Sequence, residues 1–175
     1  MNENIILTGF MGTGKSTIGC LVAAELQRDF IDMDILIEQR QDRTISRIFT
    51  ESGEAYFRQL EADVCCELAA RPGLVIATGG GTLLSETNLR VMAQTGLVIC
   101  LDCEPAVLWQ RIGRSQNRPM LAAQDDGRFA RLAALLEQRA PAYGRIKHHL
   151  DVTWLLPQEA ARQIMELVET VIGAK

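Results

Sequence analysis

The sequence predicts an α/β protein whose parallel sheet is covered by helices on both faces. Short apolar and β-branched runs alternate with helical stretches along the 175 residues. This alternation is typical of parallel sheets with crossover helices. A glycine-rich segment, residues 9–16, joins the first expected strand directly to the first expected helix. The length suits one domain, and we expect residues 1–175 to form it.

The first half of the chain provides two expected strands. Residues 5–8 and residues 30–32 are short runs of apolar or β-branched residues bounded by polar or glycine residues, as strands require. Ser52 and Gly53 interrupt a long helical pattern, because glycine is unfavourable inside a helix. The helices expected in this half cover residues 15–28, 35–40, 45–49 and 54–70.

The second half continues the alternation. Its expected strands cover residues 74–78, 97–101 and 151–154, and its expected helices cover residues 86–94, 105–112, 129–139 and 157–171. Residues 113–127 are polar and irregular, with Arg118 and Pro119 in the middle. Because this stretch is longer than an ordinary connection, we expect it to be a mobile functional lid.

The glycine-rich segment has the sequence GFMGTGKS, which matches G-x-x-x-x-G-K-[ST] at every defined position. Glycines let backbone N–H groups surround phosphate oxygens, and the following helix N-terminus favours negative charge. We therefore predict a P-loop NTPase that binds a nucleoside triphosphate. The expected ATP-binding residues of this loop are Gly12, Thr13, Gly14, Lys15, Ser16 and Thr17. Lys15 would contact the β- and γ-phosphates, and Ser16 would ligate Mg²⁺.

Two features select the class of P-loop protein. The chain contains no Asn-Lys-x-Asp element of the kind that recognises guanine, and it is smaller than most motor ATPases. Phosphoryl transfer to a small acceptor requires exclusion of water, which a lid provides. The sequence therefore favours a kinase that acts on a small molecule or a nucleotide.

Asp32 and Asp34 follow the second expected strand. On an extended segment, residues two apart point the same way, so both carboxylates could face the crevice above the strand ends. One could hold Mg²⁺ while the other meets the acceptor hydroxyl; an acidic helix N-terminus is the alternative. Asp102 ends an apolar strand and is a competing Mg²⁺ ligand, but we favour Asp32 and expect Asp102 to start a helix.

The composition excludes several classes of protein. The chain has 18 Lys and Arg residues against 22 Asp and Glu residues, a net charge of −4, which argues against a nucleic-acid or membrane-surface binder. No run approaches the ~18 apolar residues of a membrane span, and the first residues do not resemble a signal peptide. We expect a cytoplasmic protein with reduced cysteines. Neither the C-x-x-C of Cys100 and Cys103 nor His148-His149 is expected to bind a metal.

Two local features indicate a ligand beyond the nucleotide. Arg outnumbers Lys 15 to 3, and the planar guanidinium suits carboxylates and phosphates. Gly79, Gly80 and Gly81 end the third expected strand. Since consecutive glycines cost conformational entropy, close approach of the backbone to a ligand explains them better than an ordinary turn.

Taken in chain order, these motifs resemble the shikimate kinase family. The motifs are the P-loop, Asp32-x-Asp34, Phe57-Arg58, Gly79-Gly80-Gly81, Arg118-Pro119 and Arg139-Ala140-Pro141-Ala142-Tyr143. The resemblance covers nearly the whole chain. It implies a three-layer α/β/α sandwich related to nucleoside monophosphate kinases, with a five-stranded parallel sheet in the order 2-3-1-4-5. It also implies that residues 34–60 form a substrate-binding helical region.

The resemblance implies Mg²⁺-dependent transfer of the ATP γ-phosphoryl group to the 3-hydroxyl of shikimate, in aromatic amino-acid biosynthesis. The catalytic residues would be Asp34, Lys15 and Arg118, and the Mg²⁺ ligands Ser16 and Asp32. The substrate-binding residues would be Asp34, Arg58, Gly80, Gly81 and Arg139. Arg118 would enter with the lid, and Arg111 would lie near adenine. The family's proteins act on two small molecules, and we expect a monomer.

Two alternatives stay open on the residues alone. The chain could be another small-molecule P-loop kinase, such as a gluconate or nucleotide kinase, or a non-catalytic ATP-binding sensor. Arg58 and Arg139 favour an acceptor with a carboxylate. Asp34 and Arg118 would be superfluous in a protein that only binds ATP.

Overall fold

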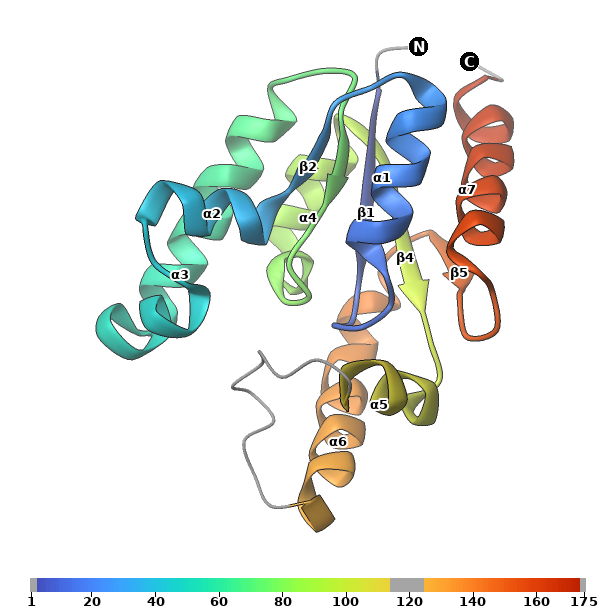
Figure 1. The fold of residues 1–175 in the computed structure, drawn as a ribbon. Helices are drawn as coiled ribbons and strands as arrows, with labels where there is room; N and C mark the ends of the chain where they lie inside the picture. The colour runs from blue at the N-terminus through green and yellow to red at the C-terminus, as the bar shows by residue number, and fades with distance from the viewer. Residues whose placement is uncertain (1–2, 114–124, 174–175) are drawn as a thin grey trace.

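The computed structural model describes residues 3–113 and 125–173 and has the predicted α/β architecture (Figure 1). Within this part of the chain, one five-stranded sheet has the order β2-β3-β1-β4-β5, and every adjacent pair is parallel. The order agrees with the one that the family resemblance implies. The strands are β1 (Asn4–Gly9), β2 (Phe30–Asp32), β3 (Val75–Ala77), β4 (Gly96–Asp102) and β5 (His148–Asp151).

Helices cover both faces of the sheet, as expected. They are α1 (Lys15–Leu26), α2 (Met33–Gln41), α3 (Ile45–Ala69), the 3₁₀ turn η1 (Thr82–Leu84), α4 (Glu86–Ala93), α5 (Pro105–Gly113), α6 (Asp125–Tyr143) and α7 (Pro157–Ile172). Alternate residues of β1 belong to opposite cores. Ile5 and Leu7 pack in the core that α1 and α7 complete, whereas Ile6 packs in the core of the other helices. The result is a three-layer sandwich.

The expected helix break at Gly53 is confirmed. α3 runs from Ile45 to Ala69, but Gly53 has φ 81° and ψ 168°, which is not helical. Thr44 caps the start of α3, where its side chain accepts a hydrogen bond from the backbone N–H of Arg47. The two helices predicted on either side of Ser52 and Gly53 are thus two segments that meet at this glycine.

The expected fifth strand is wrong by three residues. β5 covers His148–Asp151 rather than residues 151–154, and its residues pair with Ile99 through Asp102 of β4. β5 lies at the sheet edge, where polar side chains are tolerated because one side of the strand meets solvent. The apolar character of Trp154 was therefore misleading, and its side chain is 78% exposed.

The segment between α5 and α6 differs from its expected extent. α5 continues to Gly113, and α6 begins at Asp125 and continues to Tyr143 with Pro141 inside it, so it is longer than the predicted 129–139. Most of the expected lid at residues 113–127, including Arg118, lies outside the described residues. No helix of the described part has both the length and the apolar character needed to cross a membrane.

Candidate active site

The segment after β1 has the backbone of a phosphate-binding loop. Gly9, Gly12 and Gly14 have φ values of 130°, 85° and 93°, which side chains disfavour. A Cβ on Gly9 would also lie 2.4 Å from the carbonyl oxygen of Leu101. Gly14 caps α1 without a side-chain hydrogen bond, so the first N–H groups of the helix present donors to an anion.

Lys15 of the motif contacts the loop itself, and Ser16 contacts the end of β2. Lys15 Nζ donates hydrogen bonds to the carbonyl oxygens of Gly9 at 2.9 Å and Phe10 at 3.0 Å. Ser16 Oγ donates to Asp32 Oδ2 at 2.5 Å. The first turn of α1 and the carboxyl end of β2 are therefore joined by a hydroxyl–carboxylate pair.

The two oxygens of the Asp32 carboxylate have different partners. Its Oδ1 accepts hydrogen bonds from the N–H groups of Asp34 at 3.0 Å and Ile35 at 3.3 Å, which caps α2. Its Oδ2 meets Ser16. Hydroxyl and carboxylate oxygens are the donors that Mg²⁺ prefers, so the pair of Ser16 and Asp32 is chemically suited to that ion.

The expectation that Asp32 and Asp34 share one extended segment is wrong. α2 begins at Met33 because Asp32 caps it, so Asp34 lies in the first helical turn. Asp34 nevertheless faces the end of β3. Its Oδ1 is 2.6 Å from the position that a Cβ on Gly79 would take.

All three glycines after β3 lie close to polar groups of the protein, while the predicted approach of their backbone to a ligand stays a prediction. Beyond the contact of Gly79 with Asp34, a Cβ on Gly81 would lie 2.7 Å from Arg58 Nη1. A Cβ on Gly80 would lie 3.5 Å from the carbonyl oxygen of Gly9 in the phosphate-binding loop. The glycine run therefore lies between the nucleotide loop and the other predicted site residues.

Arg139 and Tyr143 both hold the Gly80 carbonyl. Arg139 Nη1 donates to it at 3.2 Å and Tyr143 Oη at 2.6 Å. The Arg139 side chain is buried, with its guanidinium 5.3 Å from the Phe10 ring centroid, an arrangement that favours the cation. Burial raises the pKa of Tyr143 to about 12, so the phenol donates at neutral pH. The sequence analysis assigned no role to Tyr143.

Arg58 is oriented by a carboxylate that the sequence analysis also missed. Arg58 Nη1 donates to Glu61 Oε2 at 2.6 Å, and the Glu61 side chain is only 2% exposed. The other oxygen of Glu61 accepts from Thr82 Oγ1 at 2.5 Å. Although burial of the guanidinium opposes it, hydrogen bonds to Glu61 and Glu54 raise the pKa of Arg58. The i,i+3 spacing of Arg58 and Glu61 was the available sequence signal.

A pocket of about 400 Å³ adjoins this ion pair. Arg58, Glu61 and Gly81 line it together with residues of η1 and α4. The Glu54 carboxylate, 65% exposed, lies at the same pocket and also accepts from Arg58. The pocket thus presents the Arg58 guanidinium, a group that can bind an anion, together with the two carboxylates that already contact it.

The two carboxylates that bind Arg58 should differ in their effect on stability. We expect Glu61→Gln to lower the free energy of unfolding by about 1–3 kcal/mol, because glutamine lacks the charge that pairs with Arg58 and has one acceptor oxygen where Glu61 has two. The matched variant Glu54→Gln should cost less than about 1 kcal/mol, since exposed ion pairs contribute little. Urea unfolding followed by circular dichroism measures both; equal losses would contradict the role of Glu61.

The remaining predicted residues lie at the edges of this arrangement. Arg111 donates hydrogen bonds to the carbonyl oxygens of Val152 and Thr153, each at 3.0 Å, and so ties α5 to the segment after β5. Thr17 is exposed in the first turn of α1. Arg118 lies outside the described residues.

Asp102 does not start a helix, contrary to expectation. α5 begins at Pro105, and the Asp102 carboxylate pairs with His149 Nδ1 at 2.7 Å. The hydroxyl of Ser16 contacts Asp32, and the preference for Asp32 over Asp102 as the Mg²⁺ ligand stays a prediction. Asp102 pairs with His149 because the parallel pairing of β5 with β4 places His149 beside the end of β4.

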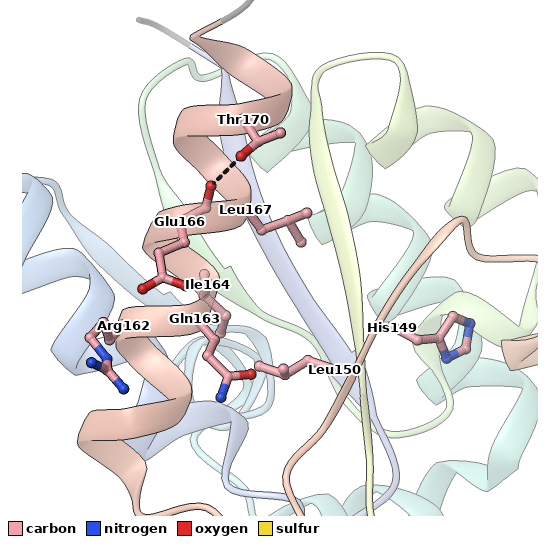
Figure 2. A pocket seen from close by; sticks show the side chains of 8 residues that line it. All are labelled: His149, Leu150, Arg162, Gln163, Ile164, Glu166, Leu167 and Thr170. Atoms are coloured by element: carbon pink, nitrogen blue, oxygen red, sulfur yellow. Dashed lines mark hydrogen bonds between the residues drawn. The ribbon is translucent and has the colours of Figure 1, made fainter.

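A second groove lies on another part of the molecule. It has a volume of about 460 Å³ and is lined mainly by α7, including Arg162, Gln163 and Glu166, with Leu150 of β5 (Figure 2). No predicted site residue lines it. The candidate active site is therefore the arrangement at the carboxyl ends of β1, β2 and β3.

Known proteins match both the sequence and this fold. The family model described as shikimate kinase matches residues 11–169. A shikimate kinase of Thermodesulfovibrio yellowstonii is 36% identical over 173 residues, 99% of each chain.

Solved structures agree. The structure of "Shikimate kinase from Acinetobacter baumannii in complex with shikimate" superposes with a TM-score of 0.91 at 34% identity, covering 97% of this chain and 94% of that one. A gluconokinase from Sinorhizobium meliloti shares the fold, with a TM-score of 0.62 at 17% identity. The match covers 99% of this chain and 98% of that one. From the family match, the identity and the coverage together, the chain belongs to the shikimate kinase family.

Proposed function

We propose that this chain, as a member of that family, transfers the γ-phosphoryl group of ATP to the 3-hydroxyl of shikimate. One observation supports the assignment of roles more than any other. The glycine run packs against the phosphate-binding loop at Gly80, against Asp34 at Gly79 and against Arg58 at Gly81. A phosphate donor and an anionic acceptor bound on either side of this run would be adjacent.

On the acceptor side, Arg58 and Arg139 bind the shikimate carboxylate. Two guanidiniums fix the orientation of an anionic ring and hence which hydroxyl faces ATP. The backbone of Gly80 and Gly81 contacts a ring hydroxyl. Asp34 accepts or orients the proton of the attacking hydroxyl.

On the donor side, the loop N–H groups and Lys15 bind the ATP phosphates. Ser16 and Asp32 hold Mg²⁺, which neutralises charge on the phosphate oxygens when it is bound. Arg118, which is outside the described residues, is expected to contact the transferring group, and Arg111 is expected to contact adenine. Phosphoryl transfer depends mainly on positioning and charge stabilisation, and these residues are of the types that provide both. A cytoplasmic location and a monomeric state remain predictions.

An assay of ADP release distinguishes this function from the alternatives. The protein is tested with ATP, Mg²⁺ and one acceptor at a time: shikimate, gluconate or a nucleoside monophosphate. We expect turnover with shikimate that requires Mg²⁺. Turnover only with another acceptor would assign a different small-molecule kinase, and ATP binding without turnover on any acceptor would indicate a sensor.

Arg58→Ala should mainly weaken shikimate binding. We expect a loss of about 2–4 kcal/mol, the cost of removing one partner of a charged contact, with ATP affinity nearly unchanged. Calorimetric titration with shikimate measures the effect. Arg162→Ala, at the groove of Figure 2, is the matched control and should bind shikimate normally. Unchanged shikimate affinity in Arg58→Ala would remove Arg58 from the acceptor site.

A further inference from the structure

Three potential metal ligands meet at the carboxyl ends of β4 and β5. The Cys100 thiol, the Asp102 carboxylate and a ring nitrogen of His149 each lie within 4.8 Å of the other two. Cys100 Sγ is 3.6 Å from Asp102 Oδ1, and His149 Nδ1 is 2.7 Å from Asp102 Oδ2. Ligand atoms around one tetrahedral zinc ion, at about 2.0–2.3 Å from the metal, are about 3.3–3.7 Å apart. The Cys100–Asp102 pair already has this separation, and the closer His149–Asp102 pair would have to open slightly to bind the ion.

The sheet register brings these side chains together. Cys100 and Asp102 are two apart on β4 and so project from the same face. His149 is the register partner of Cys100 on β5. Since His149 is far from β4 in the sequence, no spacing pattern could have revealed the cluster, and the expectation that neither Cys100 nor His149 binds a metal rested on local spacing alone.

A backbone carbonyl orients His149 as a ligand. His149 Nε2 is 3.0 Å from the carbonyl oxygen of Ile146. Because a carbonyl only accepts hydrogen bonds, this contact is satisfied when Nε2 carries a hydrogen, and Nδ1 then faces the Asp102 carboxylate, 2.7 Å away. Proteins orient metal-binding histidines in the same way, with the second ring nitrogen donating to a carbonyl or carboxylate.

The cluster is open to solvent on one side and buried on the other. Cys100 is fully buried, whereas the side chains of Asp102 and His149 are 46% and 34% exposed. His149 is also among the residues that line the groove beside α7 (Figure 2). An ion can therefore arrive past Asp102 and His149 and reach the thiol beneath them.

We propose that Cys100, Asp102 and His149 form a binding site for a thiophilic divalent cation, with Zn²⁺ as the best fit. The three side chains supply sulfur, oxygen and nitrogen, and water completes a tetrahedral set. Thiolate and imidazole ligands favour Zn²⁺ over Mg²⁺, so this site is distinct from Ser16 and Asp32. The bound ion would link the edge strand β5 to β4.

Binding has a defined proton balance. A zinc–sulfur bond forms as the Cys100 thiol loses its proton to the buffer. Burial and the nearby Asp102 raise the pKa of the Cys100 thiol, which opposes this loss, whereas Lys15 lowers it. No electron transfer is involved.

Zinc titration of the full chain tests the proposal. The protein is dialysed against chelator and titrated calorimetrically with Zn²⁺, without nucleotide and in excess Mg²⁺. We expect one ion per chain. Cys100→Ser and His149→Gln should each lower the Zn²⁺ affinity by more than about 100-fold. Loss of a residue that only supports a ligand costs up to about 100-fold, and loss of a ligand itself should cost more. The matched controls Cys66→Ser and His148→Gln, an exposed thiol and the adjacent histidine, should bind normally.

A cobalt spectrum supplies the second readout. Co²⁺ bound at this site should show a thiolate-to-metal charge-transfer band that Cys100→Ser abolishes and Cys66→Ser keeps. Circular dichroism checks that each variant is folded; should Cys100→Ser unfold, the half-exposed His149→Gln still decides the result. The proposal is overturned by the absence of stoichiometric binding, by equal affinity in His149→Gln and the wild type, or by loss of binding in Cys66→Ser.

Discussion

Asp34→Asn is expected to lower kcat by roughly 10²–10⁴-fold, the contribution typical of a positioned acid–base group. Asparagine has the same shape but cannot accept the proton of the attacking hydroxyl. The backbone N–H of Asp34 would still donate to Asp32 Oδ1, so the start of α2 should persist. The loss therefore belongs to the chemical step rather than to folding.

The affinity for ATP should be nearly unchanged in Asp34→Asn. Asp34 lies by Gly79, whereas the phosphate-binding loop meets the glycine run at Gly80. Steady-state kinetics with both substrates varied, together with an ATP titration, measure the two effects separately. Asp63→Asn, which removes an exposed carboxylate of α3, is the control and should retain full activity. An equal loss of ATP binding in Asp34→Asn would contradict its role on the acceptor side.

Lys15→Ala is expected to lower kcat/KM for ATP by roughly 10²–10³-fold, as for other lost donors to a charged transition state. The Lys15 ammonium group bonds to the carbonyl oxygens of Gly9 and Phe10, so it lies at the loop before any phosphate binds. Its removal takes away both the charge that binds the β- and γ-phosphates and two contacts that order the loop.

The effects of Lys15→Ala should be confined to the nucleotide half of the site. Shikimate binding in the absence of ATP should match the wild type, since Arg58 and Arg139 are unaltered. Lys147→Ala, an exposed lysine before β5, is the control and should have normal kinetics. A variant that keeps its ATP affinity and kcat would show that Lys15 is not a phosphate ligand. Together with Asp34→Asn, this variant separates donor binding from acceptor activation.

Local features of the sequence predicted much of the site. The phosphate-binding loop is continuous in the chain, and its glycine spacing requires the positive φ values that Gly9, Gly12 and Gly14 adopt. The glycine run after β3 was assigned to close approach of the backbone to a ligand, which stays a prediction; in the structure its neighbours are side chains and backbone of the protein. Both motifs are short, so their backbone needs could be inferred without knowledge of the fold.

The errors have physical causes outside the local sequence. The position of β5 was missed because an edge strand tolerates the polar residues His148 and His149. The geometry of Asp34 was misjudged because the Asp32 side chain caps a helix that starts one residue later. Glu61 was not predicted because its burial between Arg58 and Thr82 depends on packing that the local sequence does not show.

The order of residues in the chain was thus enough to specify the α/β alternation, the nucleotide loop and the chemical classes of both ligands. The packed structure was needed to place Glu61 behind Arg58, Tyr143 on the Gly80 carbonyl and His149 beside Cys100. The division follows from the range of the interactions. Backbone conformation and helix capping depend on neighbouring residues, whereas burial and ligand geometry depend on strands and helices that meet only after the chain has folded.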